Sequence, residues 1–289
     1  MAGQLILVGT PIGNLGDISP RALEALESCD FIAAEDTRVT MKLLNHFGIR
    51  KPLISYYEHN KRMKGEVITA RLLEGENCVL VTDAGMPAIS DPGENIVDKC
   101  HTLGIHVTCV PGPSAVVTAL AVSGMPSGRF TFEGFLSVNK KSRREHLLEI
   151  RDEKRTMIFY EAPHKLPAML TDMLDALGDR RIAMVRELTK LHEEVIRTTL
   201  AQAAARYSPD GGEIPRGEFV IIIEGAPQSD SAEDYTPGQA AEMARSLIAG
   251  GMSLSEAAKQ AAKATGLKKG DIYKLLVTEE KSVTDEESF

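Results

Sequence analysis

The most constraining stretch of the sequence is 79–93, which reads VLVTDAGMPAISDPG. The apolar run 78–81 predicts a buried parallel strand, and the residues that follow it do not suit a helix. Gly85 can adopt a positive φ, while Pro87 and Pro92 fix φ and lack an N–H donor. Because ligands of open α/β sheets bind beyond the carboxyl ends of the strands, we expect this loop to face a ligand. The alternative is an ordinary connection between a strand and a helix.

Two further predicted strands end in similar loops. The strand 4–8 leads into GTPIGNLGD, and the strand 106–110 leads into PGPSA, in which Ser114 stands at a helix N-terminus with free N–H groups. The first loop partly fits the dinucleotide-binding pattern G-x-G-x-x-G, since Gly13 and Gly16 are in place. Pro11 occupies the position of the first glycine, which makes the tight turn, so a nicotinamide-binding site is disfavoured.

The strand predicted at 31–34 ends in a dense polar cluster. Glu35 and Asp36 supply two carboxylates, and Arg38 supplies a guanidinium. This position at a strand end makes the cluster a candidate reaction site. Alternatively, Asp36 only caps the helix expected at 39–47.

The length of 289 residues fits two domains and a small appendage. We expect an α/β protein with an N-terminal α/β domain at 1–123 and a second α/β domain at 124–226. The stretch 227–238 is rich in Ser, Asp and Pro and predicts a linker. Within 236–280, a helix, a glycine-containing turn and a helix expected at 271–276 resemble a helix-turn-helix module.

Composition narrows the class of protein further. Four cysteines without C-x-x-C spacing indicate neither a disulfide framework nor a zinc site, and no metal is expected. The formal net charge of -8 argues against broad, non-specific binding of nucleic acid. The N-terminus shows no signal-peptide pattern, and no apolar run reaches membrane-spanning length. We therefore expect a reduced, cytoplasmic protein without a membrane partner.

A local basic run nevertheless stands out in this acidic chain. Residues 139–144 read NKKSRR, and a positively charged surface of this kind can contact the phosphates of RNA. The alternative interpretation is a solvated helix face. The candidate phosphate contacts in this run are Lys140, Lys141, Arg143 and Arg144.

Six motifs together resemble one known family. They are VTDAGMPAISDPG, VPGPSAV, GTPIGNLGDIS, AAEDTR, FYEAPHK and RELTK. In combination they resemble the tetrapyrrole-methylase superfamily, and within it the enzymes that methylate small-subunit ribosomal RNA. The similarity covers about 3–225, and the C-terminal helices resemble the terminal domain of that group. The superfamily usually has G-G-D-P in the central loop, whereas Met86 replaces the aspartate here.

The resemblance implies a fold, a cofactor and a reaction. It implies two α/β domains with S-adenosylmethionine (AdoMet) between them, in a homodimer. The implied reaction is 2′-O-methylation of a cytidine ribose in the decoding region of small-subunit rRNA. The residues expected to contact the cofactor are Ile12, Asp83, Ala84, Gly85, Met86, Ile89, Ser114, Ala115, Tyr160, Leu188 and Phe219.

Methyl transfer to a ribose hydroxyl also suggests roles for charged residues. The hydroxyl is a weak nucleophile, so a carboxylate from Glu35, Asp36 or Glu187 could take its proton as general base. Arg38 and Arg186 could hold neighbouring phosphates by bidentate pairing. Sister enzymes that methylate tetrapyrroles or a modified protein histidine remain an alternative, as does an RNA-binding module without activity.

Overall fold

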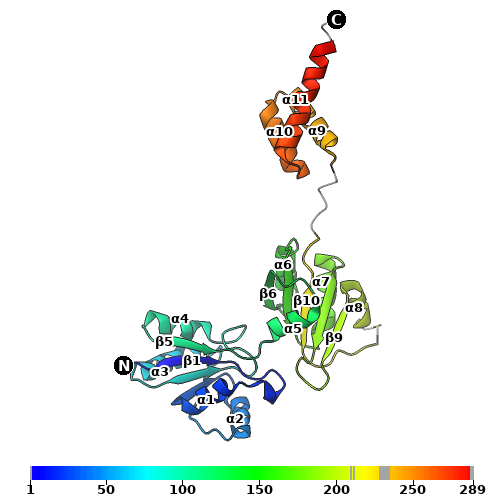
Figure 1. Ribbon diagram of the computed structural model, residues 1–289. Coiled ribbons are helices and arrows are strands. Elements are labelled where there is room, and N and C mark those ends of the chain that lie inside the picture. The colour runs from blue at the N-terminus through cyan, green and yellow to red at the C-terminus, as the bar shows by residue number, and fades with distance from the viewer. Residues whose placement is uncertain (1, 209, 211, 228–234, 287–289) are drawn as a thin grey trace. The chain divides into compact units, whose positions relative to one another are not determined.

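The computed structural model describes residues 2–208, 210, 212–227 and 235–286, with side chains described as far as Val277. The chain divides into two compact units, Met1–Gly225 and Ala226–Phe289. Within these described residues, the first unit contains two five-stranded sheets, and the second contains three helices. Figure 1 shows these elements, and each unit is described by itself below.

The first sheet is entirely parallel and has the strand order β3-β2-β4-β1-β5. Its central strands are continuous apolar runs that are buried on both faces, as parallel strands covered by helices should be. The predicted strands at 4–8, 31–34, 78–81 and 106–110 are confirmed residue for residue. The strands are β1 (Gln4–Val8), β2 (Phe31–Ala34), β3 (Leu53–Ser55), β4 (Cys78–Val81) and β5 (His106–Val110).

Four helices cover this sheet, two on each face. Helices α1 (Pro20–Ser28) and α2 (Thr37–His46) pack on one face, and α3 (Lys61–Leu73) and α4 (Glu94–Thr102) pack on the other. After the neighbouring strands β1 and β4, the chain therefore continues to opposite faces of the sheet, into α1 after β1 and into α4 after β4. Such a switch point opens a crevice at the carboxyl ends of the strands.

The second sheet is mixed and has the order β6-β7-β10-β8-β9. Strands β6 and β7 are parallel, and the other pairs are antiparallel. Helices α6 (Lys140–Glu149), α7 (Leu166–Leu177) and α8 (Leu200–Arg206) pack on one face. The strands are β6 (Phe130–Phe135), β7 (Thr156–Glu161), β8 (Arg181–Arg186), β9 (Glu194–Thr199) and β10 (Phe219–Ile223).

Helix α5 (Ala115–Ser123) joins the two halves. It follows β5 of the first sheet, but Val116, Ala119 and Leu120 pack on the face of the second sheet that α6 to α8 leave free. The loop residue Ile12, which follows β1, packs against the same cluster. The proposed domain border at 123/124 stays a prediction, and both halves contribute to the core around α5.

The C-terminal unit has a core of small side chains. It consists of α9 (Pro237–Ala249), α10 (Leu254–Thr265) and α11 (Lys269–Glu286). Six alanines, with Ile272 and Leu276, fill the space between the helices. The last helix continues to Glu286, ten residues beyond the end expected at 276, so that boundary was wrong. Most of the linker predicted at 227–238 lies outside the described residues.

Candidate functional site

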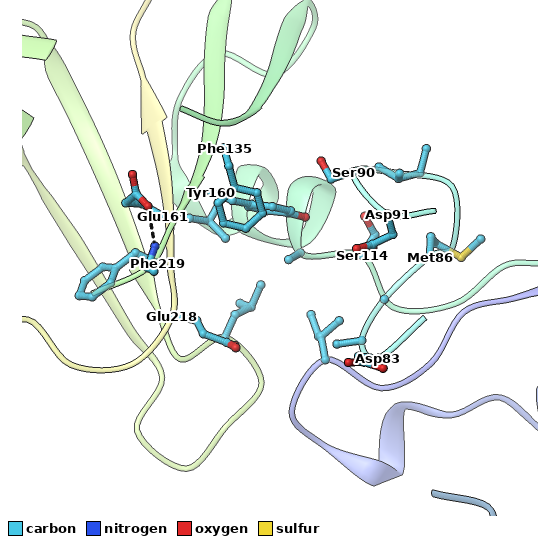
Figure 2. A pocket seen from close by; sticks show the side chains of 18 of the residues that line it. Asp83, Met86, Ser90, Asp91, Ser114, Phe135, Tyr160, Glu161, Glu218 and Phe219 are labelled. Atoms are coloured by element: carbon cyan, nitrogen blue, oxygen red, sulfur yellow. Dashed lines mark hydrogen bonds between the residues drawn. The ribbon is translucent and has the colours of Figure 1, made fainter. Parts of the chain in front are cut away.

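A cavity of about 540 Å³ lies between the carboxyl ends of the first sheet and the second sheet. Its volume is that of a typical small-molecule site. All eleven residues expected to contact a cofactor line this one cavity, although they come from both halves of the unit. Figure 2 shows Asp83, Met86, Ser90, Asp91 and Ser114 on one wall, opposite Phe135, Tyr160, Glu218 and Phe219. Their roles toward a cofactor stay predictions.

The first wall depends on a close approach of three loops. The backbones of Thr10 and Gly85 exchange two hydrogen bonds, each 3.0 Å between N and O, so the loop after β1 is held to the loop after β4. Gly85 has a φ of 87°, as the sequence suggested for this turn. A Cβ on Gly9 would lie 2.8 Å from the Cα of Gly112, so the loops after β1 and β5 touch backbone to backbone.

The loop after β4 is strained. Ala88 and Ser90 have φ values of 66° and 63°, a region that non-glycine residues rarely adopt. A Cβ on Gly93 would lie 2.7 Å from the Cβ of Ala88, so the chain folds back tightly on itself. Strain of this kind persists only where surrounding structure imposes it, and it concentrates at functional sites. The fold of the loop turns Asp91 toward the cavity.

The second wall is aromatic and apolar. Tyr160 on β7 packs edge to face against Phe132 and Phe135 on β6, with ring centroids 5.0 and 5.4 Å apart. Burial raises the pKa of Tyr160 to about 12, and the charge of Asp91 adds to this shift. A hydrogen bond to the backbone of Val116 acts in the opposite direction. The phenol is therefore neutral at physiological pH.

Three carboxylates give the first wall a negative charge. Burial, with the charges of Glu35 and Asp83, raises the pKa of Asp91 to about 6. Burial and the charge of Asp83 also raise the pKa of Glu35, and burial raises the pKa of Asp83 itself. The Oδ1 of Asp83 accepts a hydrogen bond of 3.1 Å from the backbone N–H of Asp36. A cation would relieve the repulsion among these groups.

The other candidate catalytic residues do not line the cavity. Asp36 caps α2, because its Oδ1 accepts from the backbone N–H of Arg38 at 2.8 Å, and it also pairs with the Arg38 guanidinium at 2.5 Å. Hydrogen bonds from Arg38 lower the pKa of Asp36 to about 2. Glu187 pairs with Lys190 at 2.9 Å and accepts from the backbone N–H of Glu218. Of the four candidates, Glu35 alone lines the cavity.

The basic run forms the start of α6, and its arginines have partners within the chain. The side chain of Arg143 is 12% exposed and pairs at 2.6 Å with Asp172 on α7, whose side chain is 4% exposed. Arg143 therefore docks α6 on α7 and is not placed to contact a phosphate. Arg144 also bonds to Asp172, whereas Lys140 and Lys141 are exposed. Arg186 pairs with Glu194 at 3.0 Å.

Sequence reasoning missed nine lining residues. Asp91 lies in the motif singled out first, but no sequence pattern shows that the loop turns this side chain inward. The residues missed are Ser90, Asp91, Phe135, Glu161, Ala162, Pro163, Val185, Glu218 and Val220. The described residues contain neither a helix that could cross a membrane nor a cluster of three or more potential metal ligands.

Comparison with known families decides the identity of the fold. A family model described as Tetrapyrrole (Corrin/Porphyrin) Methylases matches residues 4–204, more than half of the chain. The chain belongs to the tetrapyrrole methylase family. A second model, described as the RsmI C-terminal HTH domain, matches residues 236–280 of this tetrapyrrole methylase. The resemblance drawn from the motifs is confirmed.

Curated relatives match this tetrapyrrole methylase over almost their whole length. A protein from Xylella fastidiosa is 47% identical over 94% of this chain and 98% of its own, and one from Synechocystis is 45% identical over 94% and 97%. A protein from Thermotoga maritima is 47% identical over 77% of this chain and 99% of its own. All three bear the name Ribosomal RNA small subunit methyltransferase I.

Solved structures share the fold of this tetrapyrrole methylase at low sequence identity. Uroporphyrin-III C-methyltransferase from Thermus thermophilus, complexed with S-adenosylhomocysteine, has a TM-score of 0.53 and 16% identity over 76% of this chain and 97% of its own. Diphthine synthase has a TM-score of 0.56 and 14% identity over 77% and 89%. These likenesses support the two-sheet fold of the first unit.

Proposed function

We propose that this protein transfers the methyl group of AdoMet to the 2′-hydroxyl of a cytidine in the decoding region of small-subunit rRNA. The observation that carries the proposal is the shared cavity, where residues expected to hold the cofactor converge from both halves. The names of the curated relatives support rRNA as the substrate class. The choice of cytidine and of its 2′-oxygen rests on the resemblance of the motifs.

The chemistry of the cavity suits AdoMet. This cofactor carries a sulfonium and an ammonium group, and the carboxylates of Glu35 and Asp83 on the first wall would attract both charges. The flat faces of its adenine can pack on apolar side chains, and the opposite wall offers Val185, Leu188 and Val220. Ser114 and Ala115 stand at the N-terminus of α5, where free backbone N–H groups could hold polar atoms of the ligand. The structural relative complexed with S-adenosylhomocysteine adds support.

Methyl transfer from a sulfonium requires no metal, because the leaving group departs uncharged. Most of the rate gain would come from positioning, since well-oriented reactants have effective molarities of about 10⁵ M or more. The residues therefore have two tasks: to hold the methyl donor and the ribose in line, and to accept the proton of the hydroxyl.

The RNA contacts belong to the same proposal. Arg38, with a side chain 86% exposed, stands at the start of α2 close in sequence to Glu35 of the cavity. Its guanidinium could pair with a phosphate beside the target ribose. Lys140 and Lys141 offer further charges on the exposed surface of α6. This substrate is found in the cytoplasm, which agrees with the location expected from the sequence.

The homodimer implied by the motifs is also part of the proposal. Light scattering on the purified protein should give twice the chain mass of 31.4 kDa. A mass of one chain at working concentration would contradict the dimer without affecting the proposed reaction.

The decisive experiment uses undermethylated small-subunit particles. The purified protein is incubated with the particles and isotope-labelled AdoMet, and the digested rRNA is analysed by mass spectrometry. We expect labelled 2′-O-methylcytidine, and an excess of S-adenosylhomocysteine should suppress it. Label on a base, or transfer only to a tetrapyrrole offered in a parallel reaction, would contradict the proposal. Naked rRNA in a third reaction tests whether the assembled particle is required.

A further inference from the structure

Asp91 differs from the other two carboxylates of the first wall. The carboxylate of Glu35 interacts with the backbone N–H of Asp83, and that of Asp83 accepts from the backbone N–H of Asp36. Among the described residues, the influences on the Asp91 carboxylate are burial and the charges of Glu35 and Asp83, with no hydrogen bond or ion pair to it. Two carboxylates are thus engaged by the chain itself, and the third is free to meet a ligand.

The chain holds this free carboxylate in a fixed position. Left-handed residues precede it at 88 and 90, and Gly93 presses on Ala88 behind it. The hydroxyl of Ser90 lies 3.5 Å from the point where a Cβ of Gly134 would stand, so the loop also meets β6 of the other half. A loop that holds two strained residues and contacts both halves presents Asp91 with little freedom to turn away.

The surroundings of Asp91 combine negative and neutral groups. Glu35 at the end of β2 and Asp83 at the end of β4 repel its charge, and both raise the pKa of Asp91. From the second sheet, Tyr160 faces it across the cavity, and the charge of Asp91 in turn raises the pKa of that phenol. Figure 2 shows Asp91 and Tyr160 on opposite walls, each projecting toward the cavity.

We propose that Asp91 is the general base of the methyl transfer, and this inference rests on the proposed function. As the 2′-oxygen forms its bond to the methyl carbon, the carbon–sulfur bond breaks and its electron pair stays on sulfur. The proton of the 2′-hydroxyl passes to an oxygen of Asp91. The products are a 2′-O-methyl ribose, neutral S-adenosylhomocysteine and a protonated carboxyl, which loses its proton to water.

The electrostatics of the loop suit this task. A general base is most effective when its pKa lies near the operating pH, and the pKa of Asp91 stands at about 6. The group is then ionised at neutral pH, yet it is a stronger base than an ordinary aspartate. Glu35 and Asp83 act as positioning residues, because their charges raise the basicity of Asp91.

The test compares Asp91→Asn with the wild-type protein. Asparagine keeps the shape of the side chain but cannot accept the proton, so we expect kcat on small-subunit particles to fall about 10²- to 10⁴-fold. Calorimetric titration with S-adenosylhomocysteine should give a Kd within about threefold of the wild-type value, since only the proton acceptor is lost. The acid limb of the wild-type pH profile, near the pKa of about 6, should disappear from the residual activity.

A matched control is Asp98→Asn, which changes an exposed aspartate on α4. This variant should keep the wild-type rate and pH profile. In Glu35→Gln the acid limb should move to lower pH, because one of the charges that raise the pKa of Asp91 is removed.

Three results would overturn the inference. An Asp91→Asn protein with the wild-type rate and pH profile would show that another group takes the proton. A large loss of S-adenosylhomocysteine binding with kcat preserved at saturation would make Asp91 a cofactor contact. If the wild-type protein forms no 2′-O-methylcytidine, the proposed function fails as well, and the wild-type reaction alone distinguishes that case.

Discussion

Gly85 is expected to be important both for the backbone conformation of its loop and for ligand binding. Its φ of 87° excludes a branched side chain without strain, and it lines the cavity. We predict that Gly85→Val weakens the binding of S-adenosylhomocysteine by about tenfold or more, measured by calorimetry. The reason is that valine would both distort the turn held by Thr10 and project a branched side chain beside the ligand.

A second glycine provides the control for backbone strain. Gly48 has a φ of 72° and borders open space, since no atom lies within 4 Å of the point where a Cβ would stand. Gly48→Val therefore imposes similar strain away from the cavity. It should lower the melting temperature and leave the Kd for S-adenosylhomocysteine unchanged. Equal losses of affinity in the two variants would mean that Gly85 matters only for folding.

Asp91 also allows a prediction about stability and pH. Its pKa rises on folding from 3.8 to about 6, so between these values the folded protein binds more protons than the unfolded chain. Stability from this group is therefore present at low pH and is lost as the pH rises through 6. We predict that Asp91→Asn melts a few degrees above wild type at about pH 8, with a smaller difference at about pH 5. A difference in melting temperature between the two proteins that grows toward acid pH would contradict the predicted direction of the effect.

At the scale of elements, the predictable parts were those with strong local signals. The strands at 4–8, 78–81 and 106–110 are apolar runs followed by glycine- or proline-containing loops, and their limits were right to the residue. The strand β9 was missed because its sequence EVIRTT has only two apolar residues, which are adjacent, so it shows neither a continuous apolar run nor the alternation that indicates a strand. The helix α8 directly after it was missed with it.

The arrangement of the site was only partly predictable. The rule that parallel strands end at one edge brought Gly85 and Ser114 together correctly, because it follows from topology. The inward turn of Asp91 depends on left-handed Ala88 and on Gly93 pressing against it, and these are tertiary contacts. The same holds for Arg143, since sequence shows its charge but not its buried partner, Asp172.

The contact between α6 and α7 gives a prediction for this pair of elements. Burial would raise the pKa of Asp172, but hydrogen bonds from Arg143 and Arg144 lower it overall, so the group is ionised. Asp172→Leu leaves the mostly buried Arg143 without its partner and should cost about 3–5 kcal/mol of unfolding free energy in urea. Asp175→Leu, which changes an aspartate 59% exposed, should cost less than about 1 kcal/mol. Similar losses in the two variants would show that the pair does not dock α6.

At the scale of the whole molecule, the two units have separate cores. Alanines of α9 and α10 pack against each other and against α11, while the cavity is built from residues 12–220. The alignment with the relative from Thermotoga maritima spans 223 residues, which is 99% of that protein but 77% of this chain. That protein is therefore shorter and lacks an equivalent of the remaining residues. Because every residue that lines the cavity belongs to the first unit, binding of the cofactor is expected to require that unit only.

The helical unit is then available for a task outside the cavity. Its match to a helix-turn-helix domain suggests contact with the nucleic-acid substrate. We predict that a chain ending at Gly225 keeps the wild-type Kd for S-adenosylhomocysteine, because every residue that lines the cavity is retained. Its KM for small-subunit particles should rise about tenfold, because substrate contacts are lost while the reacting groups stay in place. As a control, both proteins are measured at raised salt. Phosphate contacts are weaker there, so the difference in KM between the full chain and the shortened chain should become smaller. An unchanged KM would show that the helical unit does not hold the substrate, and weakened S-adenosylhomocysteine binding would show that the first unit does not stand alone.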